Sequence, residues 1–383
     1  MKKNAFLSNS QKLVLLIFLA SCANLSTFQN VECEHCDIWG EDDRSEAFQI
    51  TDSNIRDASR ATGIVVYPSA HPRVNNDNQM VFDFQQSFEK KAEQTRYGFC
   101  DEVRFTDQEM FLEACSGQLV APDLFATAFH CVKPVITHQE DGTLGCTGLS
   151  VAFGYELAPD SSFPTTIPRG NFYDCKNVEI IEPDPEHHSD TSDFALIRLT
   201  EPVTGRVPSK IDFRKPQPGR ELSIWGYPYG MPLKHSKALV EDSYYTDKFI
   251  KANARLGWYT DEEVSSAEED FSKHIHFKSD IFNGNSGGPL VNPDNGAVYG
   301  VVRNASQKAK RVEATAPFEE FNTNYLWAHD SAHFDLDKTR QPACRQAIRC
   351  DDEDFLCDTH ASAGLYSNYR KQLEALGIMG IDY

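Results

Sequence analysis

The sequence has too few basic residues to bind nucleic acid. Its 383 residues include 37 Lys and Arg against 57 Asp and Glu, so the formal net charge is −20. A chain with this charge repels a phosphate backbone, and we exclude nucleic acid as a partner. The apolar run Leu13–Ala20 is too short to span a bilayer, which excludes a transmembrane helix at that place.

The sequence also lacks a pair of Cys-x-x-Cys motifs of the kind that binds a metal. Cys33 and Cys36 form one Cys-x-x-Cys motif around His35, and no second pair follows at ligand spacing. A zinc site usually needs such a second pair, so this motif is a weak metal signal. His187 and His188 are adjacent loop residues by their polar surroundings. We therefore expect no metal and no cofactor.

The first residues have the pattern of an export signal. Lys2, Lys3 and Lys12 precede the apolar run Leu13–Ala20, as in a signal peptide. The run ends in Leu-Ala-Ser-Cys22, which resembles a bacterial lipobox, and the resemblance implies a lipid on Cys22. We expect residues 1–22 to be a lipoprotein-type signal and the protein to be exported, tethered to the cell envelope or secreted. Ordinary signal cleavage nearby is the alternative.

The cysteine count supports export. The chain has 11 cysteines, and without Cys22 the remaining number is even. An even number of cysteines is suited to disulfides, which persist in oxidising compartments.

Short apolar runs predict an all-β fold. Between about residues 110 and 310 they alternate with clusters of Gly, Pro, Asn and Asp, as in an antiparallel sandwich or barrel. A helix-like piece covers Ser53–Ala61. Tyr369, Leu373 and Leu376 have helical spacing and are followed by Gly377, which predicts a terminal helix.

Three segments carry residues for nucleophilic catalysis: Cys115–Cys131, Asp193–Leu199 and Asn283–Leu290. A serine hydroxyl becomes a nucleophile when a neutral imidazole accepts its proton, and a buried carboxylate must orient that imidazole. The segments supply Ser286, His130 and Asp193 for these three roles. Gly284 permits unusual dihedrals, so its N–H and that of Ser286 can converge on a developing oxyanion.

The strings in these segments resemble the blocks of trypsin-like (chymotrypsin-fold) serine proteases. They are Cys-Ser-Gly, Thr-Ala-x-His-Cys, Asp-x-Ala-Leu and Gly-Asn-Ser-Gly-Gly-Pro, in the family's order of His, Asp and Ser. The resemblance implies two antiparallel six-stranded β-barrels with a short N-terminal and a helical C-terminal extension. It also implies a disulfide between Cys115 and Cys131 and a serine endopeptidase that cleaves protein or peptide substrates through an acyl-enzyme. We expect the protein to be a monomer.

On this basis we divide the chain into four parts. Residues 1–22 are the signal, residues 23–60 an N-terminal segment that could be a propeptide, residues 61–312 the protease domain and residues 313–383 a C-terminal extension with the terminal helix.

Two further segments resemble bacterial glutamyl-endopeptidase-like proteins: Gly226–Lys234 and Asp37–Arg44. Asn285 precedes the serine where vertebrate trypsins carry an aspartate that pairs with a newly cut N-terminus. Asn285 cannot form this ion pair, which argues against zymogen activation by that route.

The sequence does not determine the specificity of the substrate pocket. Asp280 lies six residues before Ser286, a spacing that resembles the pocket floor of trypsin and would select Arg or Lys. Phe282 stands where trypsin has a bracing cysteine, so a structural role for Asp280 is an equal alternative. Val302 and Arg303 are expected at the pocket, in a run that lacks the histidine associated with glutamyl preference.

Three alternatives remain. Phe129 replaces the usual small residue before the histidine, and a ring there could leave a catalytically weak or inactive, protease-like binding protein of the envelope. Asp190 is a rival to Asp193, although its polar surroundings indicate a loop. Gly284–Gly288 also fits the Gly-x-Ser-x-Gly motif of α/β-hydrolases, but that fold needs a helix after the serine, and Pro289 and the turn residues beyond it exclude one.

Overall fold

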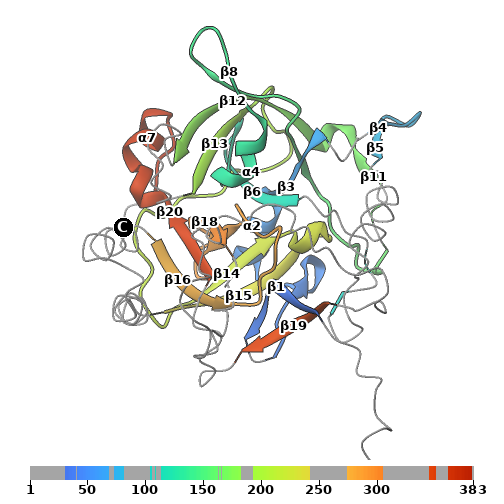
Figure 1. Cartoon of the computed structure of the whole chain (residues 1–383), viewed down its shortest axis with the longest axis vertical. Helices are drawn as coiled ribbons and strands as arrows, with labels where there is room; N and C mark the ends of the chain where they lie inside the picture. The colour runs from blue at the N-terminus through green and yellow to red at the C-terminus, as the bar shows by residue number, and fades with distance from the viewer. Residues whose placement is uncertain are drawn as a thin grey trace, which may run out of the picture.

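Two halves rich in β-strands make up the described part of the molecule (Figure 1). In this computed structural model, residues 31–39, 41–68, 73–81, 114–162, 166–182, 193–241, 274–304, 345–350 and 361–381 are described, together with residues 104, 105, 108 and 164. Cys22, His187, His188 and Asp190, and the side chains of Cys33, His35 and Cys36, lie outside the described residues. No helix within the described residues has the length and apolarity that a membrane span requires.

The first half is a closed barrel of six antiparallel strands. They follow the order β10–β3–β6–β7–β13–β12, and β12 pairs back with β10. Their bounds are β3 Thr62–Val66, β6 Ala114–Ala121, β7 Leu124–Ala128, β10 Ser150–Phe153, β12 Phe172–Glu182 and β13 Phe194–Leu199. Two short strands, β9 (Leu144–Cys146) and β8 (Ile136–His138), continue the sheet beyond β12.

The second half is built in the same way. Its strands follow the order β14–β17–β18–β20–β16–β15, and β15 pairs back with β14. Their bounds are β14 Glu221–Gly226, β15 Lys234–Val240, β16 His274–Ser279, β17 Pro289–Val291, β18 Val298–Asn304 and β20 Ala361–Leu365. The prediction of two antiparallel six-stranded barrels is therefore confirmed.

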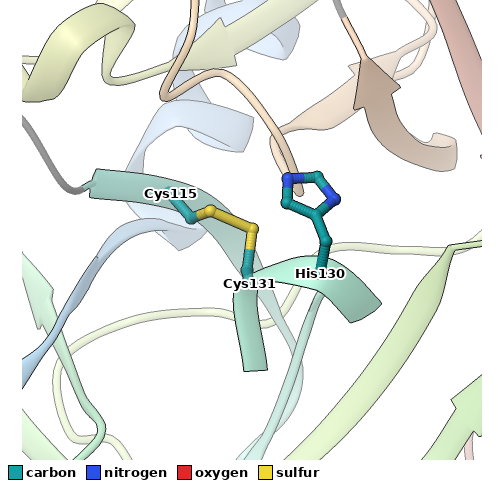
Figure 2. A group of neighbouring side chains, drawn as sticks. All are labelled: Cys115, His130 and Cys131. Atoms are coloured by element: carbon teal, nitrogen blue, oxygen red, sulfur yellow. A yellow bond between two sulfur atoms is a disulfide. The ribbon is translucent and has the colours of Figure 1, made fainter. Parts of the chain in front are cut away.

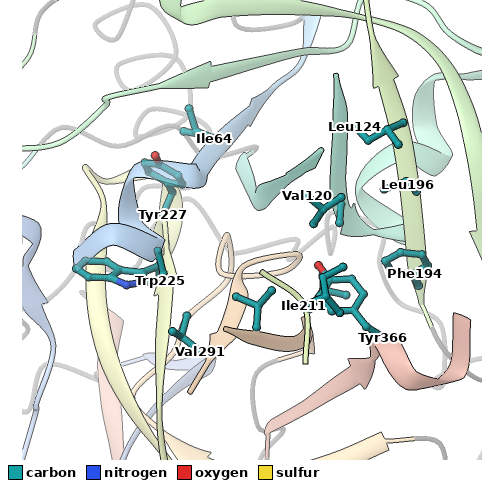
Figure 3. Close-up of a cluster of buried hydrophobic side chains, with 14 of the residues drawn as sticks. Ile64, Val120, Leu124, Phe194, Leu196, Ile211, Trp225, Tyr227, Val291 and Tyr366 are labelled. Carbon is teal, nitrogen blue, oxygen red and sulfur yellow. The ribbon is translucent and has the colours of Figure 1, made fainter. Parts of the chain in front are cut away.

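Each barrel has its own apolar core, and a third core joins them. Strand β3 shows how one apolar run serves two of these cores, because successive side chains of a strand point to opposite faces. Val65 packs inside the first barrel, whereas Ile64 and Val66 join the cluster between the barrels. The joining cluster also contains Trp225 and Tyr366 from the second half (Figure 3).

The N-terminal segment is part of this structure. Strand β2 (Ser45–Glu46) pairs with β15, and helix α2 (Ser53–Ala61) packs against β3, β6, β14 and β17. The indole of Trp225 donates a hydrogen bond of 2.9 Å to the carbonyl of Ile55. The predicted helix at Ser53–Ala61 is present, but the predicted domain start at residue 61 is too late.

The C-terminal boundary also needs correction. Strand β20 lies between β18 and β16, so the second barrel continues past residue 312. The chain then forms the 3₁₀ helix η9 (Tyr366–Tyr369) and helix α7 (Arg370–Ala375), and Gly377 follows with φ +80°. Tyr369 stacks on Phe194 of the first barrel with ring centroids 4.3 Å apart, so this predicted terminal helix docks across both halves.

The remaining elements are short. Strand β1 (Val31–Trp39) pairs in parallel with β19 (Arg345–Cys350), and β4 (Arg73–Val74), β5 (Gln79–Val81) and β11 (Thr166–Pro168) form a small sheet. Helix α4 covers Phe129–Val132, and the other 3₁₀ turns are η1 Ala47–Gln49, η3 Lys133–Val135, η4 Arg169–Asn171 and η5 Pro228–Gly230.

Candidate active site

The backbone pairing of β7 and β13 brings His130 beside Asp193. Ala128, at the end of β7, is paired with Phe194, the first residue of β13. His130 follows in α4 and Asp193 immediately precedes β13, so both leave the barrel at the same edge. The carboxylate of Asp193 accepts the His130 backbone N–H at 2.9 Å through Oδ1 and bonds the ring Nδ1 at 2.7 Å through Oδ2.

This double contact fixes the protonation and orientation of the imidazole. A carboxylate only accepts, so Nδ1 carries the proton, and in the neutral ring Nε2 is the basic nitrogen. Asp193 has φ +46°, a left-handed conformation that aspartate tolerates better than most residues. The barrel edge therefore holds Asp193 in an uncommon backbone conformation directly against His130.

The environment of His130 shifts its titration. Burial works to lower the pKa of His130, but the charge of Asp193 and the hydrogen bond to it outweigh burial, and the pKa is raised. The positive charge of Arg303 opposes that rise. His130 must be neutral to accept a proton, so this raised pKa sets the acidic limit of any base catalysis by the ring.

A disulfide anchors the histidine segment. Cys115 of β6 and Cys131 of α4 are bonded, with Cα atoms 6.1 Å apart (Figure 2). Their sulfurs lie within 4.8 Å of a His130 ring nitrogen, but sulfurs in a disulfide are not thiolate metal ligands. A second disulfide joins Cys146 of β9 to Cys175 of β12, a pairing that the sequence left open.

Ser286 lies in the loop between β16 and β17 and is held by the backbone on two sides. Its carbonyl accepts the N–H of Ser116 at 2.8 Å, and its Oγ donates to the carbonyl of Arg303 at 3.4 Å. The next residue, Gly287, donates to the carbonyl of Val302 at 2.6 Å. The candidate nucleophile therefore lies where the second barrel meets β6 of the first.

The peptide before Gly284 is turned in a way that suits an oxyanion hole. The carbonyl of Asn283 accepts the N–H of Tyr229 at 2.5 Å. In a trans peptide the N–H points opposite to the carbonyl, so the N–H of Gly284 points away from Tyr229. Neither Gly284 N nor Ser286 N donates a hydrogen bond to any other described residue. With respect to the part of the chain that the structure describes, both N–H groups are therefore open to an oxyanion.

Glycine is required at position 284. Its φ is +98°, and a Cβ there would lie 2.3 Å from the carbonyl oxygen of Tyr227. Any side chain would push the loop away from the η5 turn, so the predicted reason for a glycine at this place agrees with the observed packing.

The contacts of Asp280 favour a structural role over a role in the substrate pocket. Its carboxylate accepts the backbone N–H groups of Trp39 and Asp43, each at 2.7 Å, and the residue is buried. Burial raises the pKa of Asp280 to about 7, although these hydrogen bonds oppose the shift. Its oxygens thus anchor the N-terminal segment, which argues against selection of Arg or Lys by this carboxylate.

The other pocket predictions and Phe129 also have definite places. The side chain of Val302 is fully buried in the core of the second barrel. Arg303 is half-buried and close enough to His130 to affect its pKa. The ring of Phe129 lies in the core of the first barrel, which removes the reason to expect that it disturbs the imidazole.

Arg44 is a buried arginine that packs against the loop of Ser286 and that no sequence motif distinguished. Arg44 donates from Nε and Nη2 to the carboxylate of Asp42 at 2.9 and 2.6 Å, and its guanidinium lies 4.0 Å from the ring centroid of Phe282. The carbonyl of Phe282 accepts both the backbone N–H and the side-chain amide of Asn285, at 3.1 and 3.0 Å. The segment Asp37–Arg44 resembles a family segment, but its sequence does not predict this contact.

The comparison with known families agrees with this geometry. Residues 115–301 match the model of the trypsin-like peptidase domain. Over these residues the chain is similar to trypsin-like peptidases. The match runs from Cys115 to Val301 and so includes His130, Asp193 and Ser286. A peptidase of this family acts on protein substrates.

Solved structures of proteases are similar to the peptidase domain at low identity. A Glu endopeptidase in complex with MPD is 14% identical over 70% of this chain and 86% of its own, with a TM-score of 0.39. An inactive mutant form of Rv3671c from M. tuberculosis H37Rv is 12% identical over 67% and 80%, with a TM-score of 0.35. An inactivated protease paralogue of the scabies mite is 16% identical over 54% and 78%, also at 0.35. These likenesses are too distant to bear on function.

Proposed function

We propose that the protein is a serine endopeptidase in which Ser286, His130 and Asp193 form the catalytic triad. The observation that carries this proposal is the double contact of Asp193 with the ring and the backbone of His130. This contact holds Nδ1 protonated and leaves Nε2 as the base, which is the arrangement that serine activation needs.

The chemistry follows from these positions. His130 Nε2 takes the proton of Ser286 Oγ while Oγ attacks the scissile carbonyl carbon. The carbonyl oxygen gains a negative charge, which the N–H groups of Gly284 and Ser286 stabilise. His130 then gives its proton to the leaving amine, and an acyl-enzyme remains. Water, deprotonated by His130, attacks the ester, and Ser286 recovers its proton as the new carboxyl group leaves.

Labelling with a biotinylated fluorophosphonate tests the proposal without knowledge of the substrate. The probe phosphonylates a serine only when a base and an oxyanion site activate it. We expect the wild-type protein to be labelled, and peptide mass spectrometry to place the label on Ser286. The Ser286→Ala variant is the matched control and should stay unlabelled.

Two results would contradict this function. One is an absence of labelling in folded wild-type protein, which would favour a binding protein. The other is labelling that survives Ser286→Ala, because the reactive group would then lie elsewhere.

We also infer that the protein is exported and carries a lipid on Cys22. The lipobox-like ending at Cys22 supports this, and so do the two disulfides, which persist in an oxidising compartment. In a bacterial host fed an alkyne fatty acid, the wild-type protein should take up the label and partition with membranes. The Cys22→Ser variant should do neither, and an unlabelled wild-type protein would exclude the lipid tether.

A further inference from the structure

Ser116 connects the first barrel to both residues of the candidate oxyanion hole. It lies in β6 directly after Cys115 and is fully buried. Its backbone N–H donates to the carbonyl of Ser286 at 2.8 Å, and its Oγ donates to the carbonyl of Gly284 at 2.7 Å. The same Oγ accepts the backbone N–H of Tyr227 at 2.9 Å.

The direction of these hydrogen bonds is determined by the groups themselves. The N–H of Tyr227 can only donate, so it occupies a lone pair of the Ser116 hydroxyl. The single hydroxyl proton is then directed to the carbonyl of Gly284, which can only accept. A hydroxyl suits this place because its one oxygen both accepts from Tyr227 and donates to Gly284.

Two contacts therefore hold the peptides on either side of Gly284. On one side, the Asn283 carbonyl accepts a hydrogen bond from the N–H of Tyr229. The N–H of Gly284 belongs to the same peptide and therefore points away from Tyr229. On the other side, the Gly284 carbonyl is fixed by the Ser116 hydroxyl. Gly284 lies between these two peptides and has a φ of +98°. A glycine leaves the backbone free to rotate, and the two contacts restrict this rotation.

The backbone around Ser116 is closely packed. A Cβ on Gly287 would lie 2.1 Å from the Ser116 carbonyl oxygen, and one on Gly226 would lie 3.1 Å from its Oγ. Glycines at these positions let the nucleophile loop and β14 approach β6 closely.

We propose that Ser116 is a positioning residue of the oxyanion hole, whose hydroxyl holds the Gly284 peptide so that its N–H faces the reacting carbonyl oxygen. This inference rests on the proposed serine mechanism. Ser116 touches no substrate and acts through Gly284, so its effect belongs to the transition state rather than to substrate binding.

The test compares Ser116→Ala with Ser150→Ala. Ser150 of β10 is also buried, and its hydroxyl donates at 2.8 Å to Asp174 within the first barrel, so it controls for the loss of a buried hydroxyl. For Ser116→Ala we expect kcat to fall by about 10- to 100-fold with little change in KM, somewhat less than removal of a direct oxyanion donor. The substrate is a fluorogenic peptide selected from a combinatorial library.

An inhibitor series supplies a readout that a merely structural role would not change. A peptide aldehyde forms an oxyanion in the site, whereas the matching peptide alcohol does not. In Ser116→Ala the affinity for the aldehyde should fall in proportion to the fall in kcat/KM. The affinity for the alcohol should stay unchanged. In Ser150→Ala both affinities and kcat should match the wild type.

The outcomes separate this inference from the proposed function. If wild-type protein is not labelled by the fluorophosphonate, the serine mechanism itself fails. If the wild type is active and Ser116→Ala keeps its kcat, the positioning role is wrong. It is also wrong if the variant changes KM alone. Ser116→Gly also removes the hydroxyl and should show the same loss of kcat. If neither variant folds, Ser116 is a structural residue and the proposal is overturned.

Discussion

Replacing Asp193 with asparagine is expected to lower kcat by about 10,000-fold while KM changes little. The backbone N–H of His130 needs an acceptor, so the amide oxygen of the new side chain will face it, as Oδ1 does now. The amide NH₂ must then face Nδ1 in place of Oδ2. Nδ1 becomes an acceptor, the ring proton moves to Nε2, and the base that Ser286 requires is lost.

The pH profile of kcat/KM gives a second readout for the same variant. Asp193 raises the pKa of His130 above its ordinary value of 6.5, so wild-type activity should be lost on acidification through a pH above 6.5. Without the carboxylate this contribution disappears, and the acidic limb of the residual activity should move to lower pH.

Asp190→Asn is the matched control, because Asp190 is the rival carboxylate in the same sequence segment. Its kcat and its acidic limb should both equal those of the wild type. A large loss of kcat in Asp190→Asn together with a small loss in Asp193→Asn would refute the assignment of the triad.

Replacing Arg44 with alanine is expected to destabilise the protein by about 3 to 5 kcal/mol, because it removes one partner of a buried ion pair. Arg44 is 1% exposed and Asp42 13% exposed. After the change Asp42 keeps only the guanidinium of Arg104, at 3.7 Å, as an ion-pair partner among the described residues. The ring of Phe282 also loses its stacked cation. Urea unfolding followed by near-ultraviolet circular dichroism measures the loss.

Arg220→Ala provides the control for Arg44→Ala. Arg220 also pairs with an aspartate, Asp294, but both side chains are largely open to solvent, at 38% and 69% exposure. An exposed pair of this kind contributes about 0 to 1 kcal/mol. Equal destabilisation by the two variants would show that Arg44 has no special structural role. Arg44→Lys should not restore stability, since an ammonium cannot form the bidentate contact and the stacking together.

The sequence predicted the fold, and it singled out His130, Asp193 and Ser286, because both inferences depend on local patterns. The flanks of His130, Asp193 and Ser286 are distinctive strings, and the two-barrel architecture that their resemblance implied was confirmed. Some of the short apolar runs between residues 110 and 310 also coincide with strands, among them β6, β13 and β18. The register of the β7–β13 pairing then brings His130 and Asp193 together, and the sequence alone does not give that register.

The features that the sequence did not predict depend on contacts between distant segments. Strand β20 is Ala-Ser-Ala-Gly-Leu, which has no β-branched residue and is separated from β18 by residues 305–360, so it was assigned to an extension. Asp280 has the spacing of a pocket residue, but its partners Trp39 and Asp43 lie near the other end of the chain. Ser116 is an ordinary serine until its neighbours are known, because its role arises only where the two barrels meet.

The position of β20 also determines when the second barrel can close during biosynthesis. Both of its neighbours, β18 and β16, precede it in the chain, so the cylinder has a gap until residues 361–365 have been made. Pairings of such long sequence separation form slowly, because the intervening segment must lose its conformational freedom first. A nascent chain can therefore contain His130, Asp193 and Ser286 while the barrel that carries Ser286 is still open. Closure of the second barrel comes late, after the first barrel can already fold.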